Sequence, residues 1–80
     1  MDIGCAVKYR ILDLCNERKI TLNKLATMSG VTQSTLNNIV SGRNNRTTVS
    51  TVKKICDGLN ITILDFFSSP LFENLEQEIK

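Results

Sequence analysis

Two short stretches with helical apolar spacing, joined by a glycine, constrain the fold of this 80-residue chain more than any other feature. They cover residues 22–29 and 32–41, and apolar side chains recur in each of them three or four positions apart. Thr21 and Thr32 stand where a hydroxyl caps the start of a helix, and Gly30 stands where a helix commonly stops. The pattern predicts two short helices that are joined by a tight turn.

The residues around this turn meet separate steric demands. Helices that cross at a steep angle need a small residue at their closest approach, which Ala26 provides. The turn needs a residue that accepts a positive φ without strain, which Gly30 provides. Leu36 and Ile39 hold the second helix on the core by one face and leave the other face open to a partner. These offsets favour a helix-turn-helix, and a helical hairpin in an unrelated bundle is the alternative.

Two further stretches predict one helix before this pair and one after it. The first ends near Arg18, and its inward positions are Val7, Ile11 and Leu14, with Ile3 at the same spacing. The second starts near Thr48, and its inward positions are Val49, Val52, Ile55, Cys56 and Leu59. Gly58 lies inside this later helix and costs about 1 kcal/mol relative to alanine, so we expect its end to fray.

The C-terminal part of the chain predicts a fifth helix and an extension. Thr62 and Asp65 form a capping pair for a short helix through Phe67, whose two phenylalanines are expected to fill the core. The Ser-Ser-Pro sequence of residues 68–70 then interrupts the chain. We therefore expect a helix-turn-helix domain over residues 1–69 and an acidic extension over residues 70–80. Its apolar spacing suits a terminal helix, a partner-binding helix or a frayed tail equally well.

The composition favours an all-α fold and excludes several other classes. Four glycines, one proline and 5% aromatic residues argue against a sandwich or barrel. No apolar run approaches the roughly 18 to 20 residues of a membrane span, and the first ten residues lack a secretory signal, so we expect a cytoplasmic protein. The three cysteines are widely spaced and are expected to be small buried hydrophobes. Because histidine is absent and no carboxylates cluster, the sequence predicts no catalytic site, metal site or cofactor.

The charges divide the chain into a basic middle and an acidic end. No acidic residue lies between Glu17 and Asp57. The basic residues in that interval are Arg18, Lys19, Lys24, Arg43, Arg46, Lys53 and Lys54. The last eleven residues reverse the sign with Glu73, Glu76 and Glu78 against Lys80, which masks the basic middle in the net charge of +2. A run of charge is commonly only a solvated face, but an interval without acids is typical of a phosphate-binding surface.

From residue 7 to residue 67 the chain resembles the lambda-repressor/Cro-like helix-turn-helix family of bacterial and phage transcription regulators. The resemblance rests on Ile11 and Leu14, on residues 21–26 (Thr-Leu-Asn-Lys-Leu-Ala), 30–36 (Gly-Val-Thr-Gln-Ser-Thr-Leu) and 41–43 (Ser-Gly-Arg), and on residues 52–56, 59–61 and 64–67 for the last two helices. It implies a compact five-helix domain that places its third helix in the major groove of double-stranded DNA. It also implies a homodimer on a palindromic operator. We expect no membrane partner, because no apolar run is long enough to span a bilayer.

Carried over by position, the resemblance assigns base reading to the third helix, at Gln33, Ser34, Asn37 and Asn38. An amide offers a donor and an acceptor in one plane, which suits the N6/N7 edge of adenine. We expect phosphate contacts from the first turn of the second helix, where free N–H groups and the helix dipole favour anions, and from the loop after the third helix. The expected phosphate-binding residues are Thr21, Asn23, Lys24, Thr35, Ser41, Arg43, Asn44 and Arg46.

The sequence thus predicts a sequence-specific DNA-binding transcriptional regulator of the repressor type. The alternative is a protein-interaction module, such as an antitoxin or adaptor, that keeps the fold and binds a protein through the acidic tail or through Tyr9 and Leu12. These two residues lie off the apolar stripe of the first helix, and covering by the tail is the simpler explanation for them. An enzyme is the least favoured class, because no nucleophile and base are paired in the sequence.

Overall fold

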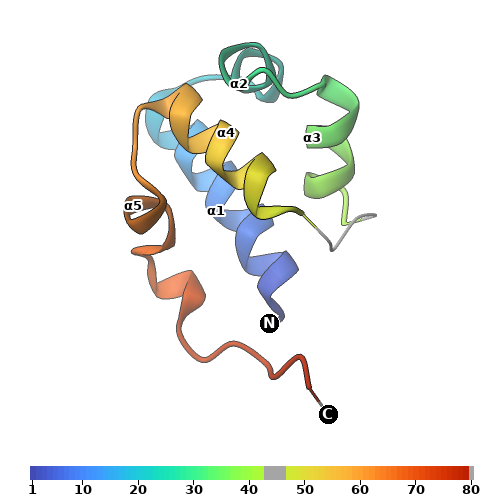
Figure 1. Cartoon of the computed structure of the whole chain (residues 1–80), viewed down its shortest axis with the longest axis vertical. Coiled ribbons are helices and arrows are strands. Elements are labelled where there is room, and N and C mark those ends of the chain that lie inside the picture. The colour runs from blue at the N-terminus through green and yellow to red at the C-terminus, as the bar shows by residue number, and fades with distance from the viewer. Residues whose placement is uncertain (43–46, 80) are drawn as a thin grey trace.

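The computed structural model describes residues 1–42 and 47–79, which form α-helices and one short 3-10 helix. The elements are α1 (Ile3–Arg18), α2 (Leu22–Ser29), α3 (Gln33–Val40), α4 (Val49–Leu59), α5 (Ile63–Phe67) and η1 (Pro70–Phe72). Helix α2 packs on α3 and α4, while α3 and η1 pack on α1, and α5 packs on α4. In Figure 1, α3 and α5 lie on opposite sides of the molecule. The all-α, five-helix prediction is confirmed.

Each α-helix begins with a side chain that caps its N-terminus. Asp2 caps α1, where its carboxylate accepts a hydrogen bond of 2.8 Å from the Cys5 N–H. Threonine hydroxyls cap the other four helices, at Thr21, Thr32, Thr48 and Thr62. At the start of α5, the Asp65 carboxylate also accepts a hydrogen bond of 3.1 Å from the Thr62 N–H, which completes a capping box. A cap of this kind contributes about 1 kcal/mol to stability. The sequence predicted the caps at Thr21, Thr32 and Thr62, and it predicted Thr48 as the approximate start of its helix.

Three helices end with a residue in the left-handed conformation. Gly30 ends α2 with a φ of 65°, as its sequence position predicted. Lys19 ends α1 with a φ of 55° and Asn60 ends α4 with a φ of 58°, and neither was predicted. The backbone N–H group of each of these residues donates to a carbonyl in the last turn of its helix, which satisfies acceptors that a helix end otherwise leaves free.

Helix α4 continues through Gly58 to Leu59, so the frayed end that we expected is not seen. Gly58 lies where α4 meets the end of α2. A Cβ atom on Gly58 would lie 2.5 Å from the Ser29 hydroxyl oxygen and 3.0 Å from the Met28 carbonyl group. The missing side chain therefore permits the close approach of α2 and α4, and this packing compensates for the poor helix propensity of glycine.

One core joins the helices. It consists of Val7, Ile11, Leu14, Cys15, Leu25, Ala26, Leu36, Ile39, Val52, Ile55, Cys56, Leu59 and Phe66. Four predictions about burial were wrong. Val49 is 79% exposed and Ile3 is 36% exposed, because helical spacing alone does not determine which side chains the neighbouring elements cover; Phe67 is 38% exposed beside the fully buried Phe66, and Cys5 is exposed.

Arg10 connects α1 to the end of α5 across 55 residues of sequence. Its Nε donates to the Phe66 carbonyl at 2.7 Å and its Nη2 donates to the Asp65 carbonyl at 2.9 Å. A guanidinium at the C-terminus of a helix satisfies free carbonyls and is favoured by the helix dipole.

The C-terminal extension forms one 3-10 turn and then runs without regular structure to residue 79. Phe72 packs beside Phe67 with ring centroids 4.8 Å apart. Further on, the Glu76 N–H donates to the Met1 carbonyl at 3.1 Å, and the Glu76 carboxylate lies 3.6 Å from the Met1 ammonium group. The described part of the extension thus lies against the start of α1 rather than forming a longer helix, and it leaves Tyr9 43% exposed.

Candidate nucleic-acid interface

The junction of α2 and α3 has the geometry that the sequence predicted. The N–H groups of Gly30 and Val31 both donate to the Ala26 carbonyl, which closes the end of α2 and starts the turn. Ala26 is buried at the crossing, and Leu36 and Ile39 are buried under α3. Helix α3 is therefore held firmly by one face while its other face stays open, which is the requirement for a reading helix.

The open face of α3 carries polar side chains without charge. Gln33, Ser34 and Asn37 are exposed on it, and Asn38 is half-buried at its edge. Within residues 1–42 and 47–79, the amide groups of these residues make no hydrogen bond to the protein, so their donors and acceptors remain available. The structure brings these four predicted residues together on one short helix.

Two hydroxyl groups predicted to bind phosphate already have partners. The Thr35 hydroxyl lies 2.7 Å from the Thr32 hydroxyl, and the Ser41 hydroxyl donates to the Asn38 carbonyl at 3.2 Å. A hydroxyl has a single donor hydrogen, so Ser41 must rotate away from α3 before it donates to a phosphate. Thr35 is also half-buried, which limits its reach.

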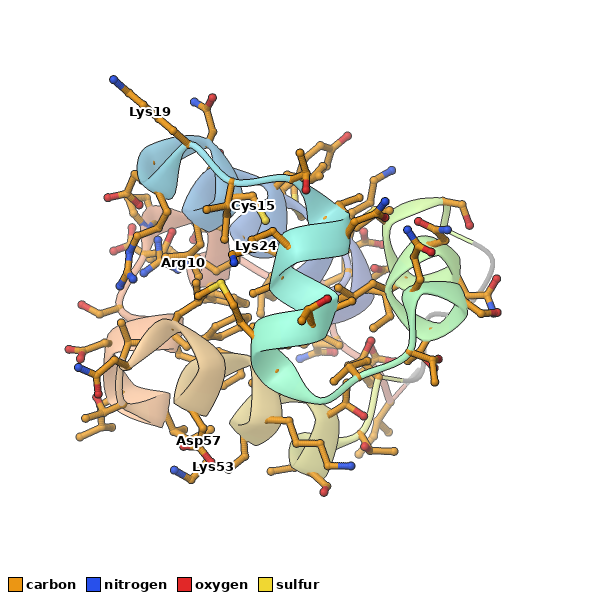
Figure 2. All side chains as sticks on the ribbon, turned by 90° about the horizontal axis from the view of Figure 1, so that it is seen from above. Arg10, Cys15, Lys19, Lys24, Lys53 and Asp57 are labelled. Atoms are coloured by element: carbon orange, nitrogen blue, oxygen red, sulfur yellow. The ribbon has the colours of Figure 1, made fainter. Side chains whose placement is uncertain are left out.

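The predicted residues of α2 separate onto two sides of that helix. The Thr21 hydroxyl accepts from the Lys24 N–H at 3.1 Å, and the Thr27 hydroxyl donates to the Asn23 carbonyl at 3.2 Å, so Asn23 and Thr27 share a face. Lys24 is exposed, and Figure 2 shows its side chain extending from α2 on the side away from α3. The spacing of Asn23 and Thr27 by one helical turn was the signal that would have added Thr27 to the predicted surface.

The three remaining predicted phosphate contacts, Arg43, Asn44 and Arg46, lie outside the described residues. Among the described basic residues, Lys53 forms an ion pair with Asp57 on α4 (Figure 2). The hydrogen bond to Asp57, followed by the charge of that carboxylate, raises the pKa of Lys53. Asp57 therefore partly neutralises one of the seven cations of the basic interval.

The first turns of the helices differ in charge. No acidic residue occurs in the first turn of α2, α3 or α4, whereas Asp2 caps α1 and Asp65 lies in the first turn of α5. A carboxylate at such a position offsets the partial positive charge of the helix N-terminus. Helices α2, α3 and α4 keep this charge, which favours an external anion such as a phosphate.

Residues 1–42 and 47–79 contain no group of three or more side chains placed to hold a metal ion. No helix within the same ranges combines the length and the apolar character that a membrane span requires.

The crossing of α2 and α3 over a glycine turn, with an open polar face on α3, defines a helix-turn-helix protein. More specifically, the chain belongs to the Cro/C1-type HTH DNA-binding domain family, whose model matches residues 10–70. Among solved structures, the crystal structure of the prophage Lp1 protein 11 is similar, with a TM-score of 0.78 and 37% sequence identity over 88% of this chain and 93% of that chain. Comparison with curated proteins gave no match. The resemblance to lambda-repressor/Cro-like regulators is confirmed.

Proposed function

We propose that this protein is a sequence-specific transcriptional repressor that inserts α3 into the major groove of double-stranded DNA. The observation that carries the proposal is the exposed, uncharged amide face of α3, which is anchored from behind by the buried side chains of Leu36 and Ile39. Planar amides discriminate between bases by paired hydrogen bonds, and the absence of charge on this face limits indiscriminate attraction to phosphates.

Phosphate contacts fix the register of such a helix on the duplex. The N-terminus of α2, with Thr21 and Asn23, supplies backbone N–H groups beside the reading face, and no carboxylate competes with a phosphate in its first turn. Arg43, Asn44 and Arg46 follow α3 in the sequence and are assigned to the other side of the same groove. Lys24 extends away from α3, so we assign it a smaller share of this binding than the sequence reading did.

We further propose that two copies of the chain bind a palindromic operator. Each copy presents one short reading helix, and eight residues of α3 reach only a few base pairs. Two copies related by a two-fold axis double the contacted sequence and place the half-sites about 34 Å apart.

Selection of bound duplexes from a random pool tests the proposal. We expect a palindromic consensus with half-sites about one helical turn apart, and binding that weakens steeply with salt. The substitution Asn37→Ala is expected to cost about 1 to 3 kcal/mol on the selected duplex and to relax the preference at one base position. Arg43→Ala is the matched control, and it is expected to weaken binding to selected and random duplexes alike.

Fluorescence anisotropy supplies the decisive comparison. An affinity weaker than about 0.1 mM for any duplex at about 50 mM salt lies below ordinary non-specific binding and would reject DNA binding altogether. An equal loss on selected and random duplexes with Asn37→Ala would reject the reading role of α3 and leave only the phosphate-binding role.

A further inference from the structure

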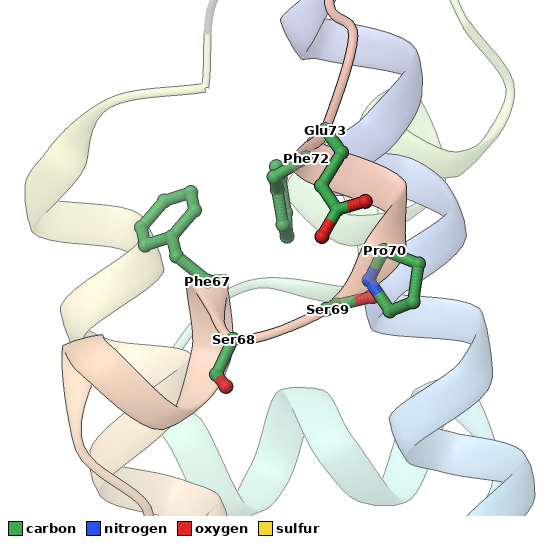
Figure 3. A pocket seen from close by; sticks show the side chains of 6 residues that line it. All are labelled: Phe67, Ser68, Ser69, Pro70, Phe72 and Glu73. Carbon is green, nitrogen blue, oxygen red and sulfur yellow. The ribbon is translucent and has the colours of Figure 1, made fainter.

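A cleft of about 350 Å³ lies between the end of α5 and η1, on the side of the molecule opposite α3 (Figure 1 and Figure 3). It is lined by Phe67, Ser68, Ser69, Pro70, Phe72 and Glu73, and we refer to it as the α5–η1 cleft. The rings of Phe67 and Phe72 meet edge to face, with an angle of 62° between their planes. Figure 3 shows the two rings on one side of the opening, Pro70 on the other, and the Glu73 carboxylate between Phe72 and Pro70.

Carboxylates outnumber cationic groups around this cleft. Residues 60–79 contain Asp65, Glu73, Glu76 and Glu78 and no basic side chain. Arg10 reaches the end of α5, but two backbone carbonyls hold its guanidinium there. The salt bridges within residues 1–42 and 47–79 join Lys53 to Asp57 and Met1 to Glu76, so the Glu73 carboxylate has no cationic partner in this part of the chain.

A second cleft of about 490 Å³ lies beside the first and shares Ser69, Pro70 and Glu73 with it. Asp13 of α1 lines this second cleft, so an exposed carboxylate stands in each of the two hollows. Apolar surface adjoins them, because Leu64 lies one turn before Phe67 on α5 and is 81% exposed. The combination of aromatic rings, carboxylates and an exposed leucine is complementary to a segment that is both cationic and apolar.

We propose that the α5–η1 cleft binds an arginine-bearing apolar segment of a second, different protein. A guanidinium group stacks on aromatic rings and pairs with a carboxylate through two parallel hydrogen bonds, whereas an ammonium group offers only a point charge. In the bound state, the guanidinium lies against Phe67 and Phe72 and pairs with Glu73, while apolar side chains of the segment cover Leu64.

The negative charge of Glu73 argues against two other occupants of the cleft, a nucleic acid and a second copy of this chain. A nucleic acid is disfavoured, because the Glu73 carboxylate lines the cleft and no basic side chain does. A second copy of this chain whose two-fold axis passed through the cleft would bring Glu73 of one copy toward Glu73 of the other, and like charges oppose such a contact. Since α5 and α3 lie on opposite sides in both Figure 1 and Figure 2, a segment in the cleft leaves the proposed DNA-reading face open.

The test uses a blocked five-residue peptide of alternating leucine and arginine, and an identical peptide in which citrulline replaces arginine. Citrulline keeps the shape of the side chain and removes its charge. In titrations of the full isotope-labelled chain, we expect the arginine peptide to shift amide resonances of residues 66–73 and to bind about tenfold more tightly than the citrulline peptide. Glu73→Gln is expected to weaken binding of the arginine peptide about threefold. Glu78→Gln removes the same charge from the tail outside the cleft and is expected to leave binding unchanged.

Equal affinity for the two peptides, or equal losses with Glu73→Gln and Glu78→Gln, would overturn the proposal, since either result shows diffuse attraction to an acidic surface. Resonance shifts on α3 in place of residues 66–73 would also overturn it. If neither peptide binds and Leu64→Lys converts a dimer to a monomer, the face belongs to a second copy and the proposal is wrong. No DNA is present in these titrations, so their outcome does not depend on the proposed repressor function.

Discussion

The two sides of the molecule use the same threonine caps but differ in where they place carboxylates. Thr21, Thr32 and Thr48 begin α2, α3 and α4 without an acidic residue in the first turn. Thr62 begins α5 in the same way, but Asp65 completes a capping box there and Glu73 follows at the end of η1. The hydroxyl cap satisfies the backbone on both sides, and the carboxylates then determine whether a helix end remains attractive to an external anion.

The same contrast extends to the apolar residues. The leucine of α3, Leu36, is fully buried and fixes this helix to the core, whereas Leu64 of α5 is 81% exposed. A buried leucine stabilises the fold, and an exposed one is available to a partner. The same residue type is therefore part of the core on one side of the molecule and exposed to solvent on the other.

The largest expected effect is on the free energy of unfolding, and it distinguishes Leu36 from Leu64. Leu36→Ala removes a fully buried side chain and is expected to lower the free energy of unfolding by about 2 to 5 kcal/mol. Leu64→Ala is the matched control and is expected to change it by less than about 0.5 kcal/mol. Urea denaturation followed by circular dichroism measures both variants. Similar losses for the two would mean that α5 buries Leu64 in solution and would remove the contrast.

The next effect tests charge in the two regions. Gln33→Glu places a carboxylate on the reading face and is expected to weaken DNA binding by about 1 to 3 kcal/mol, through a lost base contact and repulsion by phosphates. Gln77→Glu adds the same charge to the already acidic tail, and we expect no change in affinity at about 150 mM salt. Anisotropy titrations of one selected duplex compare them. A larger loss of affinity with Gln77→Glu would indicate that DNA binds near the C-terminal extension, which would contradict binding by α3.

The smallest expected effect concerns the buried thiols between the two sides. Burial raises the pKa of the Cys15 and Cys56 thiols. Because the folded state holds these thiols neutral and the unfolded state lets them ionise near pH 8.5, their contribution to stability is complete below that pH and is lost as the pH rises further. We expect thermal unfolding midpoints to fall between about pH 8.5 and 10. The double variant Cys15→Ala/Cys56→Ala is expected to show a shallower fall, and an identical pH profile would contradict the assignment to the thiols.

The sequence predicted most of the fold because helix starts, one stop and the turn are local signals. A threonine before an apolar stripe and a glycine after it are recognised without knowledge of the neighbours. The exposed face of α3 was predicted in the same way from helical spacing, because Leu36 and Ile39 identify the buried side of this helix.

The failures concern features that depend on other elements. The exposure of Val49 and Phe67 follows from where α4 and α5 come to lie, which periodicity alone does not determine. The packing role of Gly58 depends on the backbone of α2, and the hydrogen bonds of Arg10 reach carbonyls more than 50 residues away. The α5–η1 cleft also depends on how separate elements pack, because its two aromatic rings come from α5 and η1, which the Ser-Ser-Pro sequence of residues 68–70 separates.

Amide chemical-shift mapping of the labelled protein with a selected duplex tests the central claim most directly, since it reports the binding face residue by residue. At about 50 mM salt we predict the largest shifts at Gln33, Ser34 and Asn37 and in the first turn of α2, with none along α5 and η1. Shifts that cluster on α5 and η1 and spare α3 would contradict the account.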